Sequence, residues 1–326
     1  MAGKKAKKTY AQKWRQYNAA QVNEKAKFLL LLHALCQGVW ELPQRRGRPH
    51  LPIADVLFCM AVKVYTKFPA RRSASDLVMA HERGLISRVP GYNTILKYFG
   101  MRQLTRYLRH LITESSLPLT TIEQDFAVDS SGFSTSTFGR YVDLRFGKAD
   151  VIDKRKWIKV HLTCGVQTQI VTAVEVTKPN AGDSPYFKPL VETTSQNFDI
   201  REVSADKAYS SLANLKLVTD KRGTPYIPFK VNAKPEGKDP LWTRLYYFYA
   251  YNEEWFKAHY HKRSNVETTF SMIKEKFGQR LRSKTETAQV NEALCKVLCH
   301  NICVVIQSMY ELGIEPDFWN DEKKAS

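Results

Sequence analysis

The hydrophobic period of this sequence changes near residue 124. Before that point, apolar residues recur every three to four positions, which predicts helices at 23–39, 53–65, 73–83 and 93–99. After it, short β-rich runs predict strands at 126–128, 157–166, 169–177, 201–205 and 224–230. Helical patterns at 183–194, 210–219 and 262–277 separate or follow these runs. This order predicts an α/β fold, a mixed sheet flanked by helices, behind an all-α N-terminal region.

The charge of the chain is distributed unevenly. Lys and Arg total 50 against 32 Asp and Glu, a net charge of +18. Residues 1–120 hold 21 of the basic and 6 of the acidic side chains, whereas residues 121–326 hold 29 and 26. The basic front favours a nucleic-acid partner, and the nearly neutral back leaves its carboxylates for another task. The alternative is a chain that lysine merely keeps soluble.

Three N-terminal features refine this prediction. The Lys-rich residues 1–20 are expected to form a flexible arm, and residues 21–120 a helical DNA-binding region. Within it, the two short helices around Gly84 resemble a helix-turn-helix at about 73–100. Ordinary packed helices of an N-terminal cap would show the same pattern, so both interpretations stay open.

Neither a membrane span nor a zinc site is expected. The longest apolar runs fall far short of about 20 residues, and no secretion signal is present. Six scattered cysteines favour a reducing cytoplasm. Cys295, Cys299 and Cys303 lie at i, i+4 and i+8 with His300 among them. Because one helix cannot surround zinc tetrahedrally, this spacing predicts the buried face of a core helix.

Two aspartates follow predicted strands. Asp129 is expected at the end of the strand that begins at Phe126, and Asp206 at the end of the strand 201–205. A lone aspartate in such a place is usually a turn or cap residue. Two aspartates on neighbouring strands repel each other unless a divalent metal binds between them. The pair therefore suggests a metal site at one edge of the sheet.

The helix at 262–277 has an ordered polar stripe. At roughly 100° per residue, its polar residues Tyr260, Arg263, Glu267 and Lys274 fall within about 60°. The simpler interpretation is an i, i+4 ion pair worth a few tenths of a kcal/mol. The functional interpretation is a metal-binding carboxylate whose neighbouring cations hold phosphates.

The spacing of these four residues matches the signature of DDE transposases of the IS4/IS5 type. Residues 127–132 and 204–209 are similar to the two aspartate segments of that family, and residues 159–162 and 176–184 are similar to the segments between them. The resemblance runs from about residue 124 to residue 307. It implies an RNase H-like catalytic domain over 121–310, with a small insertion at about 231–258 and a C-terminal tail at 311–326.

The resemblance also implies a chemistry. Asp129, Asp206 and Glu267 would be the catalytic and metal-binding residues, holding two divalent ions, normally Mg²⁺ with Mn²⁺ able to substitute. Tyr260, Arg263 and Lys274 would bind DNA near Glu267. The partners would be double-stranded DNA, both terminal inverted repeats and target DNA, and a second copy of the chain in the DNA complex. The expected location is the nucleoid of a prokaryotic cytoplasm, away from any membrane.

Alternatives to the transposase interpretation stay open. One is another RNase H-like DNA nuclease, such as a resolvase, and another is a catalytically silent, host-retained DNA-binding protein. An RNA-binding module is disfavoured because the sequence has no Gly-rich loop or RNA-stacking motif. The aromatic cluster over 242–255 is expected to be the packed core of the insertion, although one ring could stack on a flipped base. Asp183 is expected to cap a helix and His161 to be a satisfied sheet residue.

Overall fold

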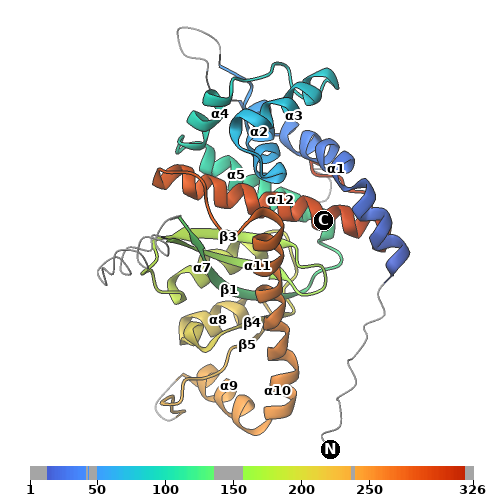
Figure 1. Ribbon diagram of the computed structural model, residues 1–326. Coiled ribbons are helices and arrows are strands. Elements are labelled where there is room, and N and C mark those ends of the chain that lie inside the picture. Colours follow the sequence, from blue (N-terminus) through green and yellow to red (C-terminus); the bar gives the residue numbers. More distant parts are fainter. Residues whose placement is uncertain (1–12, 42, 44–49, 136–156, 236–238, 320–326) are drawn as a thin grey trace, which may run out of the picture.

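A computed structural model describes residues 13–41, 43, 50–135, 157–235 and 239–319 (Figure 1). The helical N-terminal region lies at one end of the molecule, the sheet lies in the middle, and two helices lie at the other end. The predictions for residues 1–12 of the arm, 236–238 of the insertion and 320–326 of the tail lie outside the described residues.

The sheet has five strands in the order β3-β2-β1-β4-β5. They are β1 Asp125–Ser134, β2 Trp157–Gly165, β3 Val171–Thr177, β4 Glu202–Ala205 and β5 Thr224–Tyr226. β2 is antiparallel to both β1 and β3, whereas β4 is parallel to both β1 and β5. The predicted mixed α/β class, consistent with an RNase H-like fold, is confirmed. β1 is longer than predicted, so Asp129 lies in mid-strand and not at a strand end.

The helices agree with the predicted pattern in most places. The N-terminal ones are α1 Trp14–Gln37, α2 Ile53–Thr66, α3 Ala70–Glu82, α4 Tyr92–Phe99 and α5 Leu104–Ser116. Those among and after the strands are α7 Ser184–Ser195, α8 Leu212–Asp220, α9 Pro240–Tyr251, α10 Glu253–Tyr260, α11 Ser264–Phe277 and α12 Glu286–Leu312. Short 3₁₀ segments are η1 Leu117–Leu119, η3 Lys207–Tyr209 and η4 His261–Arg263.

Two N-terminal predictions were incomplete. α5 was not predicted at all, and α1 begins at Trp14 within the stretch expected to be a flexible arm. The early turns of α1 are held by tertiary contacts: Ala20 is buried, and the ammonium of Lys13 donates to the carbonyl of Glu311 at 3.0 Å. Glu311 is 298 residues away from Lys13 in the chain, so local sequence does not reveal this contact.

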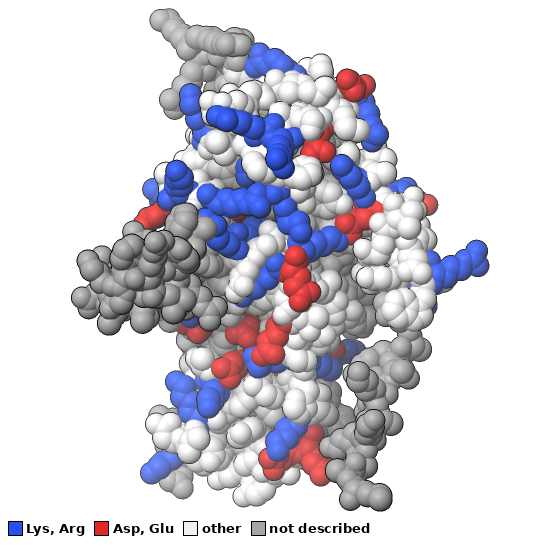
Figure 2. Space-filling view, viewed as in Figure 1, with Lys and Arg blue, Asp and Glu red and all other residues white. Residues whose placement is uncertain are grey.

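Charge is segregated on the surface as well as along the sequence. Figure 2 shows lysine and arginine side chains gathered over the helical region and at the level of α12. Acidic side chains gather lower on the same face, around the level of the sheet. The basic band and the acidic group therefore lie side by side on one face.

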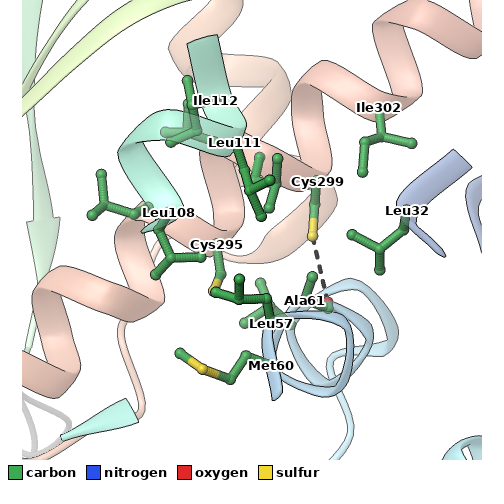
Figure 3. Packing of buried hydrophobic residues seen from close by; sticks show 14 of the residues in the cluster. Leu32, Leu57, Met60, Ala61, Leu108, Leu111, Ile112, Cys295, Cys299 and Ile302 are labelled. Carbon is green, nitrogen blue, oxygen red and sulfur yellow. Dashed lines mark hydrogen bonds between the residues drawn. The ribbon is translucent and has the colours of Figure 1, made fainter. Parts of the chain in front are cut away.

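α12 is the central core helix. It lies between the N-terminal helices and the sheet (Figure 1). Figure 3 shows Cys295 and Cys299 among apolar side chains of α1, α2 and α5, with the Cys299 thiol donating to the carbonyl of Ala61 at 3.4 Å. Both cysteines are fully buried, which raises the pKa of each thiol above its usual range. The predicted core role of these cysteines is confirmed.

The length and apolar composition of α12 would also suit a membrane span. Of its apolar window, 78% is buried inside the protein. It is the one such helix in the part of the chain that the structure describes. Because most of this window is buried inside the protein, α12 is a core helix.

The two faces of the sheet are covered differently. One core extends without a break from the N-terminal helices through α12 and α11 to Ala127 and Phe133 of β1. The other packs Phe126 and Val128 of β1 against α7 and α8. Because side chains alternate along a strand, Asp129 lies on the α11 face and Ser130 on the α7 face.

The burial of His300 on α12 predicts that the stability of the fold decreases at acidic pH. Its ring is 2% exposed, with Nε2 2.9 Å from the carbonyl oxygen of Gln169, and burial lowers its pKa from 6.5 to about 4. The unfolded chain takes up this proton near pH 6.5 but the folded chain only near pH 4. The stability from neutral His300 is therefore present above about pH 6.5 and is lost as the pH falls toward 4, by about 3 kcal/mol.

We expect His300→Gln, which keeps an N–H donor, to flatten the pH dependence of stability across this window. The measurement is urea unfolding at pH 7.0 and 4.5, with His261→Gln as the control because His261 is exposed. Equal pH dependence in wild type and His300→Gln would contradict the prediction.

Candidate active site

Asp129 and Asp206 are brought together by parallel strand pairing. Val128 of β1 pairs with Ala205 of β4, so the next residues along the two strands are the two aspartates. One oxygen of Asp129 accepts from the amide of Ser130 at 2.8 Å, and one oxygen of Asp206 accepts from the amide of Lys207 at 2.7 Å. Each carboxylate is thus oriented by a backbone N–H and keeps its second oxygen for other partners.

Glu267 reaches the same place from α11 through Arg263. The guanidinium of Arg263 donates to Asp129 at 2.7 Å and to Glu267 at 2.5 Å. Tyr260 completes this corner, because its ring centroid lies 5.9 Å from the Arg263 guanidinium carbon. Three of the four residues of the polar stripe therefore converge on the strand aspartates. Glu267 is the most open member, with 57% of its side chain exposed.

Lys274 lies two turns further along α11 on the same side. Its ammonium donates to the hydroxyl of Ser131 at 2.6 Å and lies 5.4 Å from the Phe133 ring. Burial lowers the pKa of Lys274. Ser131 shares the strand face of Asp129, so Lys274 extends the site along β1.

The electrostatics of Asp129 show that the three carboxylates are close enough to interact. Burial raises the pKa of Asp129, the cation of Arg263 opposes that rise, and the negative charges of Asp206 and Glu267 add to it. A bound cation would offset the repulsion of Asp129 by Asp206 and Glu267. The site is therefore a set of partly buried anions with one arginine as their counter-ion.

A second ion network anchors this helix to the sheet, and the sequence analysis missed it. Lys262 donates to Asp125 at 2.8 Å and to Glu202 at 2.7 Å, and His259 lies 2.8 Å from Glu202. Arg201 pairs with Asp125 as well. These contacts hold η4 against the first residues of β1 and β4. They therefore fix the position of Arg263, the last residue of η4. Asp125 and Glu202 lie 137 and 60 positions from Lys262 in the sequence, so no local pattern predicts this network.

Asp183 is at the helix N-cap position but does not cap α7 with its side chain. It accepts instead from the hydroxyl of Ser130 at 2.8 Å and from the ammonium of Lys159 at 2.6 Å. This corrects the predicted cap. His161 is fully buried in the sheet, as predicted, with Nε2 2.9 Å from the hydroxyl of Thr177. Its Nδ1 lies 3.4 Å from Asp183 without a hydrogen bond, so among the described residues the ring is satisfied at one nitrogen only. Since Ser130 lies on the opposite face from Asp129, Asp183 stays apart from the three carboxylates.

The aromatic cluster of α9 and α10 only partly forms a core. Trp242, Tyr246 and Tyr249 pack around Phe229 with centroid separations of 4.8 to 5.7 Å. No residue of α9 is fully buried, and Tyr251 is 79% exposed. The predicted packed core thus describes one side of α9, and the other side faces solvent.

The donor set fits a hard divalent cation by its chemistry. Carboxylate oxygens are the protein ligands that Mg²⁺ prefers, and the repulsion felt by Asp129 favours a cation at this place. Within the described ranges, no three carboxylate, imidazole or thiolate groups lie close enough together to hold a metal ion. Arg263 lies between Asp129 and Glu267 instead. Metal binding would thus require these two carboxylates to exchange Arg263 for the cation.

A family model described as a transposase DDE domain matches residues 121–302, more than half of the chain. The chain belongs to this family. The match contains the whole sheet, α11 and the first half of α12, and the N-terminal helices precede it. Transposase DDE domains act on DNA and generally use divalent metals. No solved structure matches the chain.

Proposed function

We propose that this DDE protein is an insertion-sequence transposase of the IS4/IS5 type, which cuts the ends of its element and joins them to target DNA. One observation carries the proposal. Arg263 binds Asp129 and Glu267 at once, and the charges of Asp206 and Glu267 both act on Asp129. This coupling of acidic residues from β1, the end of β4 and α11 supports the proposed triad.

The proposed roles follow from these contacts. Asp129, Asp206 and Glu267 would hold two Mg²⁺ ions, with Mn²⁺ able to substitute. When bound, the ions supply an activated water or 3′-hydroxyl and stabilise charge on the leaving oxygen. Arg263 is released from Asp129 and Glu267 and pairs with a DNA phosphate, for which its two donors are suited. Lys274 and Tyr260 position the DNA strand from either side of Arg263.

The remaining parts of the chain complete the proposal. Residues 21–120 would bind DNA, with α3 and α4 as the helix-turn-helix and the exposed Asn93 and Lys97 of α4 in the major groove. Residues 121–310 would be the catalytic domain. A homodimer would hold two terminal inverted repeats together in the nucleoid of the cytoplasm, with no membrane partner.

The deciding experiment uses a labelled duplex that carries the inverted repeats flanking the gene, incubated with the full chain and Mg²⁺. Cleavage at the element end followed by joining to a target plasmid, both stopped by EDTA, is the expected result. Cleavage without joining would favour the RNase H-like nuclease or resolvase. Binding without cleavage in Mg²⁺ or Mn²⁺ would favour the silent DNA-binding protein.

A further inference from the structure

A small basic hollow lies where α2, α12 and the segment after α11 meet. Five basic side chains and one acidic side chain contribute to its wall: Lys63, Lys67, Arg280, Arg282, Lys296 and Glu292. Its volume of about 20 Å³ has room for about one water molecule, so a phosphate could place an oxygen in it while the rest of the group stays at the mouth, and a base could not enter. The charge of the hollow suits such an anion.

The one carboxylate in the wall is already engaged. Glu292 accepts from the amides of Arg282 and Ser283 at 2.8 to 3.0 Å. It shapes the turn that follows α11, and its single negative charge lies in the same wall as Lys63, Lys67, Arg282 and Lys296. An excess of cations therefore faces the hollow.

Two of the lysines are buried, which is costly for an ammonium without an anionic partner. Lys296 is 1% exposed and donates to the carbonyls of Gly278 and Arg280 at 2.6 and 2.8 Å, which leaves one of its three protons. Lys63 is 7% exposed, and its ammonium lies 5.1 Å from the Phe99 ring. Among the described residues, Lys63 has no hydrogen-bond acceptor. An acceptor from outside the chain would satisfy both ammonium groups.

The position of the hollow relates it to the carboxylates. Glu267 is on the first turn of α11, and Arg280 follows three residues after the helix ends at Phe277. Phe277 lines the hollow, and the ten residues from Glu267 to Phe277 rise about 15 Å along α11, which equals about four base pairs of B-form DNA at 3.4 Å each. In Figure 1 α11 runs from the sheet up to α12, and Figure 2 shows the basic band at the level of α12.

We propose that this hollow binds a backbone phosphate of the DNA duplex, about four base pairs from the phosphate at Asp129, Asp206 and Glu267. It would hold the duplex against both the helical region, through α2, and the catalytic sheet, through α11. The proposal rests on the proposed function for the place of the DNA end, but the binding itself needs no catalysis.

The test compares two double variants of the full chain. Lys67→Gln with Arg280→Gln removes two exposed charges at the hollow. Lys216→Gln with Lys221→Gln removes two exposed charges from α8 and its C-cap and is called the α8 variant. Affinity for the inverted-repeat duplex is measured against salt concentration without metal. The slope is that of the logarithm of the binding constant against the logarithm of the salt concentration. We expect the hollow variant to reduce the size of this slope by about one, the value for one lost phosphate contact, and to weaken binding about tenfold. Slope and affinity equal to those of the α8 variant would overturn the proposal.

A second measurement uses a duplex with one neutral methylphosphonate, moved stepwise from the cleavage point. Wild type should lose affinity when the neutral linkage lies about three to five base pairs from the cleavage point, and the hollow variant should show no such additional loss at that position. Stabilisation of wild type by inorganic phosphate, without this position-dependent loss, would assign the hollow to a free anion and overturn the DNA proposal. Because both readouts are binding, a wild type that binds but never cleaves would contradict the proposed function and leave this test intact.

Discussion

Replacement of Asp129 by asparagine is expected to reduce cleavage of the element end by about 10³-fold or more, with equal losses for Asp206→Asn and Glu267→Gln. Each substitution keeps the size of the side chain but removes the charge that a divalent cation requires. Loss of several kcal/mol of transition-state charge stabilisation corresponds to this factor. Since Arg263 already links Asp129 to Glu267, the two should behave as members of one site.

The measurement is single-turnover cleavage at saturating DNA and Mg²⁺. Glu275→Gln is the matched control, because Glu275 lies on the same helix and is exposed. A second readout is the rise in melting temperature when Mg²⁺ is added, which the three variants should lose and Glu275→Gln should keep. A carboxylate variant that retains both properties would exclude that residue from the proposed metal site.

Asn301→Leu is expected to destabilise the fold by about 3 to 6 kcal/mol, because two or three buried backbone groups would lose their partners. Asn301 is fully buried on α12. Its amide donates to the carbonyls of Ile112 and Val171 at 3.1 and 2.7 Å, and its oxygen accepts from the amide of Val171 at 2.9 Å. One side chain thus ties α12 to α5 and to the first residue of β3.

Such a loss is a large part of the 5 to 15 kcal/mol that stabilises a typical domain. Urea unfolding followed by circular dichroism measures it, and Asn180→Leu is the control, since Asn180 is exposed in a loop and should change stability by less than about 0.5 kcal/mol. A decrease below about 1 kcal/mol for Asn301→Leu would show that these hydrogen bonds contribute little.

The sequence by itself determined the fold class and predicted the site residues. Strand and helix periods are local properties, because the geometry of each element sets which residues share a face. The hairpin of β2 and β3, the strand before Asp206 and the helix with Glu267 could all be predicted for that reason. The stripe from Tyr260 to Lys274 followed from the turn angle of a helix alone, and its resemblance to a transposase signature agrees with the family of the chain.

Only the tertiary structure decided how these residues meet. The bridge from Arg263 to Asp129 spans 134 positions, and the anchor from Lys262 to Asp125 spans 137. Side chains so far apart become neighbours because β1 and β4 pair in parallel, η4 packs against both strands and α11 packs on β1 and β2. No local pattern encodes these contacts. The same reason explains the missed helix α5, the early start of α1 and the basic hollow. Each depends on α12, whose burial joins the N-terminal helices and the sheet into one core.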